Sequence, residues 1–259
     1  VEGMQSAKTK VVTSTELLDI ESVPPTLAIV GAGVIGMEFA SAFNTFGSKV
    51  DVYEFLPECL PAIDKDIARR LRKSLEKRGV KFHMKYSVGN VDDLGADVVL
   101  IATGRAANTD GLALEKAGIS YDRKGITVDD NMLTNVAGVY AVGDVNGRSM
   151  LAHAAEWQGR RAVNHIIGEH DDIRFDIMPS AIFTYPEAAC VGPAESELKE
   201  KGVEYAVHKS FYRANGKALA IGETEGMMKI ITDTSDRVIS CHGYGAHAAD
   251  LIQEVSALM

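Results

Sequence analysis

The chain has 259 residues and a formal net charge of −9 at pH 7, from 27 lysines and arginines against 36 aspartates and glutamates. This length allows two domains, each with its own core. The acidic balance argues against a nucleic-acid-binding surface. No apolar run reaches the roughly 18 residues of a membrane span and no signal peptide is recognisable, so we expect a cytoplasmic protein without a membrane partner.

Three widely separated cysteines, Cys59, Cys190 and Cys241, form no close pair. A disulfide framework and a zinc site are therefore not expected, which fits a reducing compartment, and nothing else in the sequence indicates a metal.

Residues 1–23 form a polar lead-in. Thr13 to Glu16 offers an N-cap for a short helix around Leu17, and Pro24-Pro25 ends that helix ahead of the central motif.

The central motif spans residues 27–54. It opens with a short apolar run, 27–30, typical of a buried parallel strand. Gly31, Gly33 and Gly36 follow in G-x-G-x-x-G spacing and lead into a predicted helix that ends near Gly47. A second predicted strand ends on Glu54.

Each residue type in this motif suits a dinucleotide. Gly31 allows a tight turn, Gly33 lets the backbone approach a pyrophosphate, and Gly36 lets the helix pack closely on the strand. The helix N-terminus attracts the phosphates, and Glu54 is placed for a ribose diol. No Arg or Lys between Tyr53 and Ala62 could hold a 2′-phosphate, which favours NAD over NADP. A ligand-free structural turn is the alternative.

The first half continues the alternation of strands and helices. A helix is predicted over 65–78, a strand over 80–84, and a buried run over 96–102 that ends at Gly104. This order predicts a doubly wound parallel sheet, an α/β fold, with Gly104 at the same edge as Gly31 and Glu54. The basic residues of 69–78 are spread around the helix, so we interpret them as a solvated face.

A second unit follows. Strands are predicted over 125–128 and 139–142, and a helix over 151–167. Asp144 comes directly after the second strand, where its carboxylate could accept hydrogen bonds from a polyol. From the residues alone, a turn or helix-capping aspartate is the stronger interpretation.

From Pro179 onward the pattern changes to short alternating segments. Strands are predicted at 181–184, 202–210, 218–221, 227–231 and 238–242, and a helix at 249–259. This pattern predicts an antiparallel sheet with flanking helices, an α+β domain beginning near residue 177.

Four motifs together resemble the flavin-dependent pyridine nucleotide-disulfide oxidoreductases, and most closely the dihydrolipoamide dehydrogenases among them. They are GAGVIGMEFASAFNTFGSKV with Glu54, ATGR at 102–105, TNVAGVYAVGDV with MLAH at 134–153, and MPSAIFTYPEAACVG at 178–192. The resemblance spans nearly the whole chain.

The resemblance implies two cofactor sites. The NAD residues would be Gly31, Ala32, Gly33, Val34, Ile35, Gly36, Met37, Glu38, Glu54, Val88 and Gly104. The FAD residues would be Asp144, Met150, Leu151, Ala152 and His153. Glu38 would lie near the nicotinamide and the flavin; the plainer alternative is an acid that complements the helix dipole.

The resemblance also implies four segments. These are a remnant of the FAD domain or a linker (1–23), an NAD-binding domain (24–104), the second part of the FAD-binding domain (105–176), and a dimer-interface domain (177–259). The implied protein is a homodimer that oxidises protein-bound dihydrolipoamide and passes electrons through a disulfide and FAD to NAD+. Its partner would be the lipoyl domain of a 2-oxoacid dehydrogenase or glycine cleavage complex.

The sequence departs from the family pattern in its chemistry. It contains no C-x-x-x-x-C redox pair and no H-P-T-x-x-E segment, His247 does not match that motif, and the 89–95 connection is short. We interpret the three cysteines as structural and expect a fragment that is inactive by itself. A non-catalytic NAD-binding or dimerisation module, or a mercuric reductase-like or glutathione reductase-like relative, are the alternatives.

Overall fold

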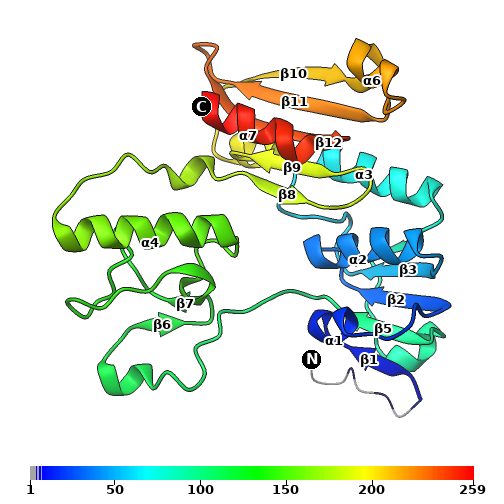
Figure 1. The fold of residues 1–259 in the computed structure, drawn as a ribbon, viewed down its shortest axis with the longest axis horizontal. Helices are drawn as coiled ribbons and strands as arrows, with labels where there is room; N and C mark the ends of the chain where they lie inside the picture. Colours follow the sequence, from blue (N-terminus) through cyan, green and yellow to red (C-terminus); the bar gives the residue numbers. More distant parts are fainter. Residues whose placement is uncertain (1–3, 5, 7) are drawn as a thin grey trace. The chain divides into compact units, whose positions relative to one another are not determined.

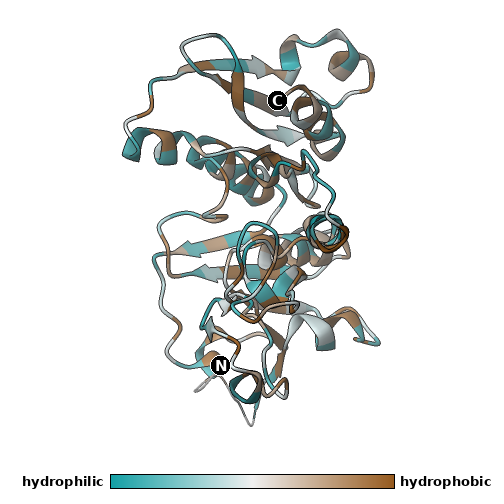
Figure 2. Cartoon of the chain, turned by 90° about the vertical axis from the view of Figure 1, so that its left-hand side faces the viewer, coloured by the Kyte–Doolittle hydropathy of each residue, from teal (hydrophilic) through white to brown (hydrophobic). Residues whose placement is uncertain are grey.

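The structure is a computed structural model that describes residues 4, 6 and 8–259. The chain forms two compact units (Figure 1). The first combines the residues up to Gly104 with Pro179–Met259, and the second is Arg105–Met178. Helices carry hydrophilic and hydrophobic residues side by side, as expected for helices that pack on one side (Figure 2). No helix in the described part of the chain is long and apolar enough to span a membrane.

The first unit contains a parallel sheet of five strands in the order β1-β5-β2-β3-β4. Its strands are β1 (Lys10–Val12), β2 (Thr26–Val30), β3 (Lys49–Glu54), β4 (Lys81–Met84) and β5 (Val98–Ile101). The helices of this half are α1 (Ser14–Leu18), α2 (Val34–Thr45) and α3 (Lys65–Lys77), with a 3₁₀ turn, η1 (Val91–Leu94), in the short connection before β5. The predicted doubly wound α/β order is confirmed.

The central strand is buried on both faces. Leu27 and Ile29 of β2 belong to one hydrophobic cluster, while Ala28 and Val30 belong to another on the opposite face. Because successive side chains of a strand point to opposite sides, this split explains why the run is apolar at every position.

The lead-in is more structured than expected. β1 pairs with β5 in parallel and forms an edge of the sheet, so part of the segment interpreted as a linker or FAD-domain remnant joins the first sheet. The predicted cap is confirmed: Thr13 and Glu16 form a reciprocal capping box at the start of α1.

The second sheet of this unit is antiparallel, as predicted, in the order β10-β11-β12-β9-β8. Its strands are β8 (Ser180–Ile182), β9 (Ala188–Val191), β10 (Ala206–Phe211), β11 (Gly226–Thr232) and β12 (Val238–Gly245). Its helices are α5 (Glu195–Glu200), η5 (Tyr212–Ala214), α6 (Gly216–Ala220) and α7 (Ala248–Leu258).

The strand predicted over 218–221 is wrong, because this segment lies in helix α6. The Asn215 side chain accepts hydrogen bonds from the backbone N–H groups of Lys217 and Ala218 and so caps the helix.

The second unit has little regular sheet. It contains η2 (Leu114–Ala117), β6 (Tyr121–Asp122), β7 (Gly125–Ile126), η3 (Gly143–Asn146), α4 (Ala152–Ile167) and η4 (Phe175–Ile177). The predicted strand 125–128 shrinks to the two residues of β7, and 139–142 forms only an isolated bridge between Leu133 and Tyr140. An apolar run becomes a strand only where a neighbour supplies the ladder hydrogen bonds. Helix α4 is close to the prediction.

Candidate functional site

The first turn after β2 requires glycine. Gly31 has a φ of +106°, and a Cβ there would lie 2.4 Å from the carbonyl oxygen of Ala102. Its N–H donates to the carbonyl of Tyr53 at 2.8 Å, which joins the turn to the end of β3. The close approach to β5 therefore fixes this residue as glycine.

The other two glycines of the motif have different roles. A Cβ on Gly36 would lie 2.0 Å from the carbonyl oxygen of Gly31, so only glycine lets α2 pack this close to the turn. Gly33 has no heavy atom within 4 Å of an added Cβ, and its φ is −75°. Open space above Gly33 is what an approaching pyrophosphate needs.

The N-terminus of α2 is available to an anion. Gly33 is the N-cap residue, and no side chain among the described residues caps this helix. The first N–H groups and the positive end of the helix dipole therefore face the open space beside Gly33. These features fit the pyrophosphate of a dinucleotide.

A cavity of about 510 Å³ lies at the carboxyl ends of β2, β3 and β5. The predicted residues that line it are Gly31, Gly33, Glu54, Val88 and Gly104. The lining residues that were not predicted include Tyr53, Phe55, Tyr86, Ser87 and Thr103. All five lie near the carboxyl end of β3, β4 or β5, so the rule that ligands bind at the carboxyl ends of parallel strands could have found them.

Glu54 is buried at the edge of this cavity, with 9% of its surface exposed. One carboxylate oxygen accepts the Ala32 N–H at 2.6 Å and the other accepts the Leu56 N–H at 2.7 Å. Each oxygen keeps lone pairs for further donors such as ribose hydroxyls. No described residue that lines the cavity is Lys or Arg, so nothing there would neutralise a 2′-phosphate.

Aromatic side chains form one wall of the cavity. Tyr53 stacks on His83 with ring centroids 4.4 Å apart and lies 5.2 Å from Tyr86. His83 is held by Asp51, with Nε2 and Oδ1 2.8 Å apart. Burial raises the pKa of Tyr53, with the Asp51 charge adding to the effect, so its hydroxyl stays neutral. Tyr53 and Tyr86 give the cavity a wall suited to a flat heterocycle.

The remaining predicted NAD residues lie outside the lining of this cavity. Met37 is fully buried in the core, and Ala32 is buried beneath the turn. Val34 and Ile35 begin α2. Glu38 accepts a hydrogen bond from the Phe183 N–H at 2.9 Å, which ties α2 to the segment after β8.

In the second unit, Asp144 is exposed on η3. Its neighbours are held by Gln158 of α4, whose Oε1 accepts the Gly143 N–H and the Asn146 amide, each at 2.8 Å. Gln158 is buried. Sequence reasoning missed Gln158, because a single polar residue on a helix carries no motif, and it missed Asn146 although this residue closely follows Asp144 in η3.

The segment predicted to follow a flavin ring begins at Met150 and leads into α4. Leu151 is the N-cap residue of α4, and Ala152 and His153 are exposed in its first turn. Val142 and Met150 are 40% and 38% exposed. The Asp144 carboxylate can accept hydrogen bonds from the ribityl chain of a flavin nucleotide, and this apolar surface can pack against its ring.

The thiols of this chain are poorly suited to redox exchange. Cys59 and Cys241 are buried, and Cys190 is largely covered. Burial raises the pKa of all three thiols, to about 11 for Cys190 and about 12 for Cys241. Because the thiolate is the nucleophile, such thiols are unreactive near neutral pH, which agrees with their interpretation as structural.

Comparison with known proteins gives the family. The pyridine nucleotide-disulphide oxidoreductase model matches residues 1–159, and the dimerisation-domain model of the same group matches residues 178–259. The chain belongs to this family.

Several named relatives are dihydrolipoyl dehydrogenases. The chain is 40% identical to the mitochondrial dihydrolipoyl dehydrogenase 2 of Arabidopsis thaliana, over 97% of this chain and 54% of the relative. It is 37% identical to the dihydrolipoyl dehydrogenase of Chlamydia muridarum, over 95% of this chain and 56% of the relative. The chain therefore spans about half the length of these relatives.

Solved structures agree with the family. LpdA from Mycobacterium tuberculosis matches all of this chain and 60% of its own, with a TM-score of 0.89 and 29% identity. The HOCl-induced flavoprotein disulfide reductase RclA from Escherichia coli matches all of this chain and 64% of its own, also with a TM-score of 0.89 and 29% identity.

Proposed function

We propose that this chain is the NAD-binding and dimerisation part of a dihydrolipoyl dehydrogenase. The observation that carries the proposal is the cavity at the strand ends, with open space at Gly33, the carboxylate of Glu54 and no lining cation. The names of the relatives support the lipoyl substrate.

Different residues of the first unit bind different parts of NAD. The backbone N–H groups at the start of α2 bind the pyrophosphate. Glu54 accepts hydrogen bonds from the ribose hydroxyls, Val88 and Gly104 complete the cavity, and Tyr53 and Tyr86 pack against the adenine. Glu38 lies by the nicotinamide. Bound NAD+ supplies the hydride acceptor.

The second unit contributes to flavin binding in this proposal. Asp144 accepts hydrogen bonds from the ribityl or phosphate region, and residues 150–153 pack along the ring. Gln158 positions Asp144 by holding Gly143 and Asn146. Bound FAD supplies the electron relay between the disulfide and NAD+.

The dithiol step requires thiols other than Cys59, Cys190 and Cys241, whose pKa values are all raised. We place that step on residues of the whole protein outside this chain. Residues 177–259 mediate a homodimer, and the lipoyl domain of a 2-oxoacid dehydrogenase or glycine cleavage complex is the substrate protein. We place the protein in the cytoplasm.

The same raised thiol pKa values favour one alternative, a non-catalytic NAD-binding and dimerisation module. Turnover separates the two. The dehydrogenase reduces NAD+ with dihydrolipoamide when the whole natural protein carrying this chain is assayed, whereas the module binds NAD+ without turnover. A glutathione reductase-like protein would instead prefer NADP(H), which the lining of the cavity does not favour.

Calorimetric titration of the whole protein with NAD+ and NADP+ tests the nucleotide site. We expect NAD+ to bind at least about tenfold more tightly, because a 2′-phosphate would face Glu54 without a neutralising cation. Glu54→Gln should weaken NAD+ binding about tenfold, since its NH2 group would face either the Ala32 or the Leu56 N–H and only one acceptor oxygen would remain. Glu76→Gln, an acid on α3 outside the cavity, is the control. Equal binding of NADP+ would contradict the assignment.

A further inference from the structure

Helix α3 carries a row of cations on its outer face. Five of its residues are exposed, and four of them are the cations Lys65, Arg69, Lys73 and Lys77; the fifth is Glu76. The four cations recur at every fourth position. At about 1.5 Å rise per residue the row is roughly 18 Å long, with neighbours about 6 Å apart along the axis. We call these four residues the α3 cation row.

The other cations of this helix are engaged. Arg70 pairs with Asp66 at 3.2 Å, and Arg72 pairs with Glu58 and Glu76, each at 2.6 Å. Just beyond the helix, Arg78 lies over the Tyr185 ring at 4.1 Å. The sequence alone could not separate these cations from the row.

In contrast, the row lacks close partners. Among the described residues, Lys65, Arg69 and Lys73 form no ion pair within 4.0 Å, and Lys77 reaches only Glu225, at 3.9 Å. Like charges at i and i+4 oppose each other on a helix. The charge of the row is positive, whereas the net charge of the whole chain is −9.

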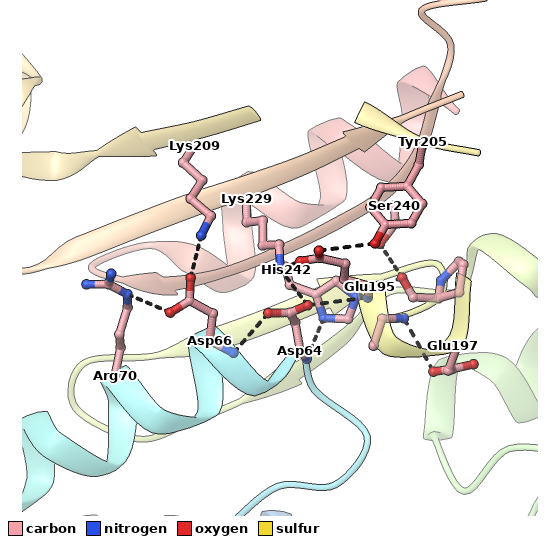
Figure 3. Close-up of polar contacts among 12 residues, drawn as sticks. Asp64, Asp66, Arg70, Glu195, Glu197, Tyr205, Lys209, Lys229, Ser240 and His242 are labelled. Atoms are coloured by element: carbon pink, nitrogen blue, oxygen red, sulfur yellow. Dashed lines mark hydrogen bonds and ion pairs between the residues drawn. The ribbon is translucent and has the colours of Figure 1, made fainter. Parts of the chain in front are cut away.

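The N-terminal end of the row borders an open cavity of about 450 Å³. Lys199 and Lys209 extend the positive charge into it. Its three carboxylates are already bonded to lysines, Asp66 to Lys209 and both Asp64 and Glu195 to Lys229 (Figure 3). With five cations against three carboxylates, the cavity retains positive charge at the end of the row.

We propose that the α3 cation row and this cavity form a docking surface for an acidic protein. The roughly 6 Å spacing of the row equals the i, i+4 spacing of carboxylates on a partner helix. Opposite charges on the two surfaces would steer and orient the encounter. An acidic side chain of the partner would enter the cavity beside Lys199.

A membrane is a poorer fit. The apolar residues of α3, Ile67, Ala68, Leu71 and Leu75, are all buried in the core. A helix that lies on a bilayer needs its apolar face free to insert.

Nucleic acid is also a poorer fit. A duplex presents one phosphate charge per about 1.7 Å, whereas the row offers four cations over roughly 18 Å, with Glu76 among them.

Fluorescence anisotropy with a labelled peptide of twelve glutamates tests the proposal on the whole protein. The row variant replaces Lys65, Arg69, Lys73 and Lys77 with Gln. The control variant makes the same change in charge at four other exposed lysines, Lys49, Lys81, Lys116 and Lys201. We expect the row variant to weaken binding about tenfold and the control variant about twofold at most. NAD+ affinity and the thermal midpoint should not change in either variant.

The salt dependence gives a second readout. The slope of log affinity against log salt should be shallower for the row variant than for the control variant, because fewer ionic contacts remain. No measurable peptide binding, or equal losses in the two variants, would overturn the proposal. Tighter binding of a 20-base-pair DNA duplex or of phosphatidylserine vesicles than of the peptide would overturn the choice of an acidic protein.

Discussion

At the scale of single residues, one glycine of the first turn is required for folding and another for binding of the nucleotide. A Cβ on Gly36 would lie 2.0 Å from the Gly31 carbonyl, whereas a Cβ on Gly33 meets nothing within 4 Å. Overpacking of this kind costs about 1–3 kcal/mol or more. We therefore expect Gly36→Ala to lower the thermal midpoint by several degrees.

Gly33→Ala should instead leave the midpoint nearly unchanged and weaken NAD+ binding, because the methyl group occupies the space left for the pyrophosphate. Thermal unfolding and titration with NAD+ check both variants. If the Gly33→Ala protein bound NAD+ as tightly as the wild type, the pyrophosphate would not bind at this turn.

His242 should make stability depend on pH. It is fully buried, its Nδ1 accepts the Asp64 N–H at 3.1 Å, and its Nε2–H donates to the Pro193 carbonyl at 3.3 Å. Burial lowers its pKa, and Lys229 adds to this, against the opposing charges of Asp64 and Glu197. A lowered folded pKa means that the unfolded state binds the proton more readily.

Stability from His242 is thus fully present above its unfolded pKa of about 6.5 and is lost as the pH falls from there through the lower folded pKa. We expect the free energy of unfolding to fall between about pH 6.5 and 5 in the wild type, and less in His242→Gln. Urea unfolding across this range measures it. Equal slopes in the two proteins would show that another group titrates. Asp64 does not titrate in this range: burial raises its pKa, but the bond and charge of Lys229, the Asp66 N–H and the charge of His242 together bring the pKa below its usual value.

At the scale of elements, a buried ion network joins α3 to the second sheet (Figure 3). Lys229 of β11 is 2% exposed and bonds to Asp64, the N-cap of α3, at 2.8 Å, and to Glu195. Burial lowers the pKa of Lys229, but its bonds to Asp64 and Glu195 raise the pKa by a larger amount. The net shift is therefore upward, and the lysine is charged.

Lys229→Met should therefore destabilise the protein by about 3–5 kcal/mol, because it leaves the buried Asp64 carboxylate without its cation. Lys209→Met is the matched control. Lys209 lies on the neighbouring strand β10 and bonds Asp66, but it is 38% exposed, so its loss should cost less than about 1 kcal/mol. Urea unfolding compares them, and similar losses would show that burial does not decide the value of these pairs.

The elements that sequence predicted best are those specified by local chemistry. The glycine turn, the capping box of α1 and the strand that ends at Glu54 each depend on residues close together in the chain. Two of the errors arose where distant partners decide: the run 139–142 finds only one bridging residue, and β1 joins the sheet by pairing with β5. The third was local, because Asn215 caps α6 through the N–H groups of Lys217 and Ala218 and so turns an apolar segment into a helix.

The candidate site follows the same division. The turn glycines and Glu54 could be predicted from the motif, and the position of Tyr86 after the end of β4 could also have indicated it. Gln158 could not be predicted, because its role depends on tertiary hydrogen bonds to Gly143 and Asn146.

At the scale of the whole molecule, the second unit carries three exposed apolar side chains close together on one helix. In the first unit the residues of the central strands are buried on both faces. In the second, α4 exposes Val163, Ile166 and Ile167 by 54%, 61% and 60%. Their i, i+3, i+4 spacing puts them on one face of the helix. Adjacent exposed apolar side chains of this kind promote association.

We therefore expect the 259-residue polypeptide, when produced alone, to aggregate and to bind a hydrophobic dye. Replacing Val163, Ile166 and Ile167 with Gln should raise the soluble fraction about threefold. NAD+ binding should not change, because the cavity residues all belong to the other unit. Gln at Leu18, Leu219 and Leu258, which are 75%, 58% and 77% exposed on three separate helices, is the control. A wild-type polypeptide that stays monomeric and unfolds in one sharp transition would contradict this, since α4 would then need no cover.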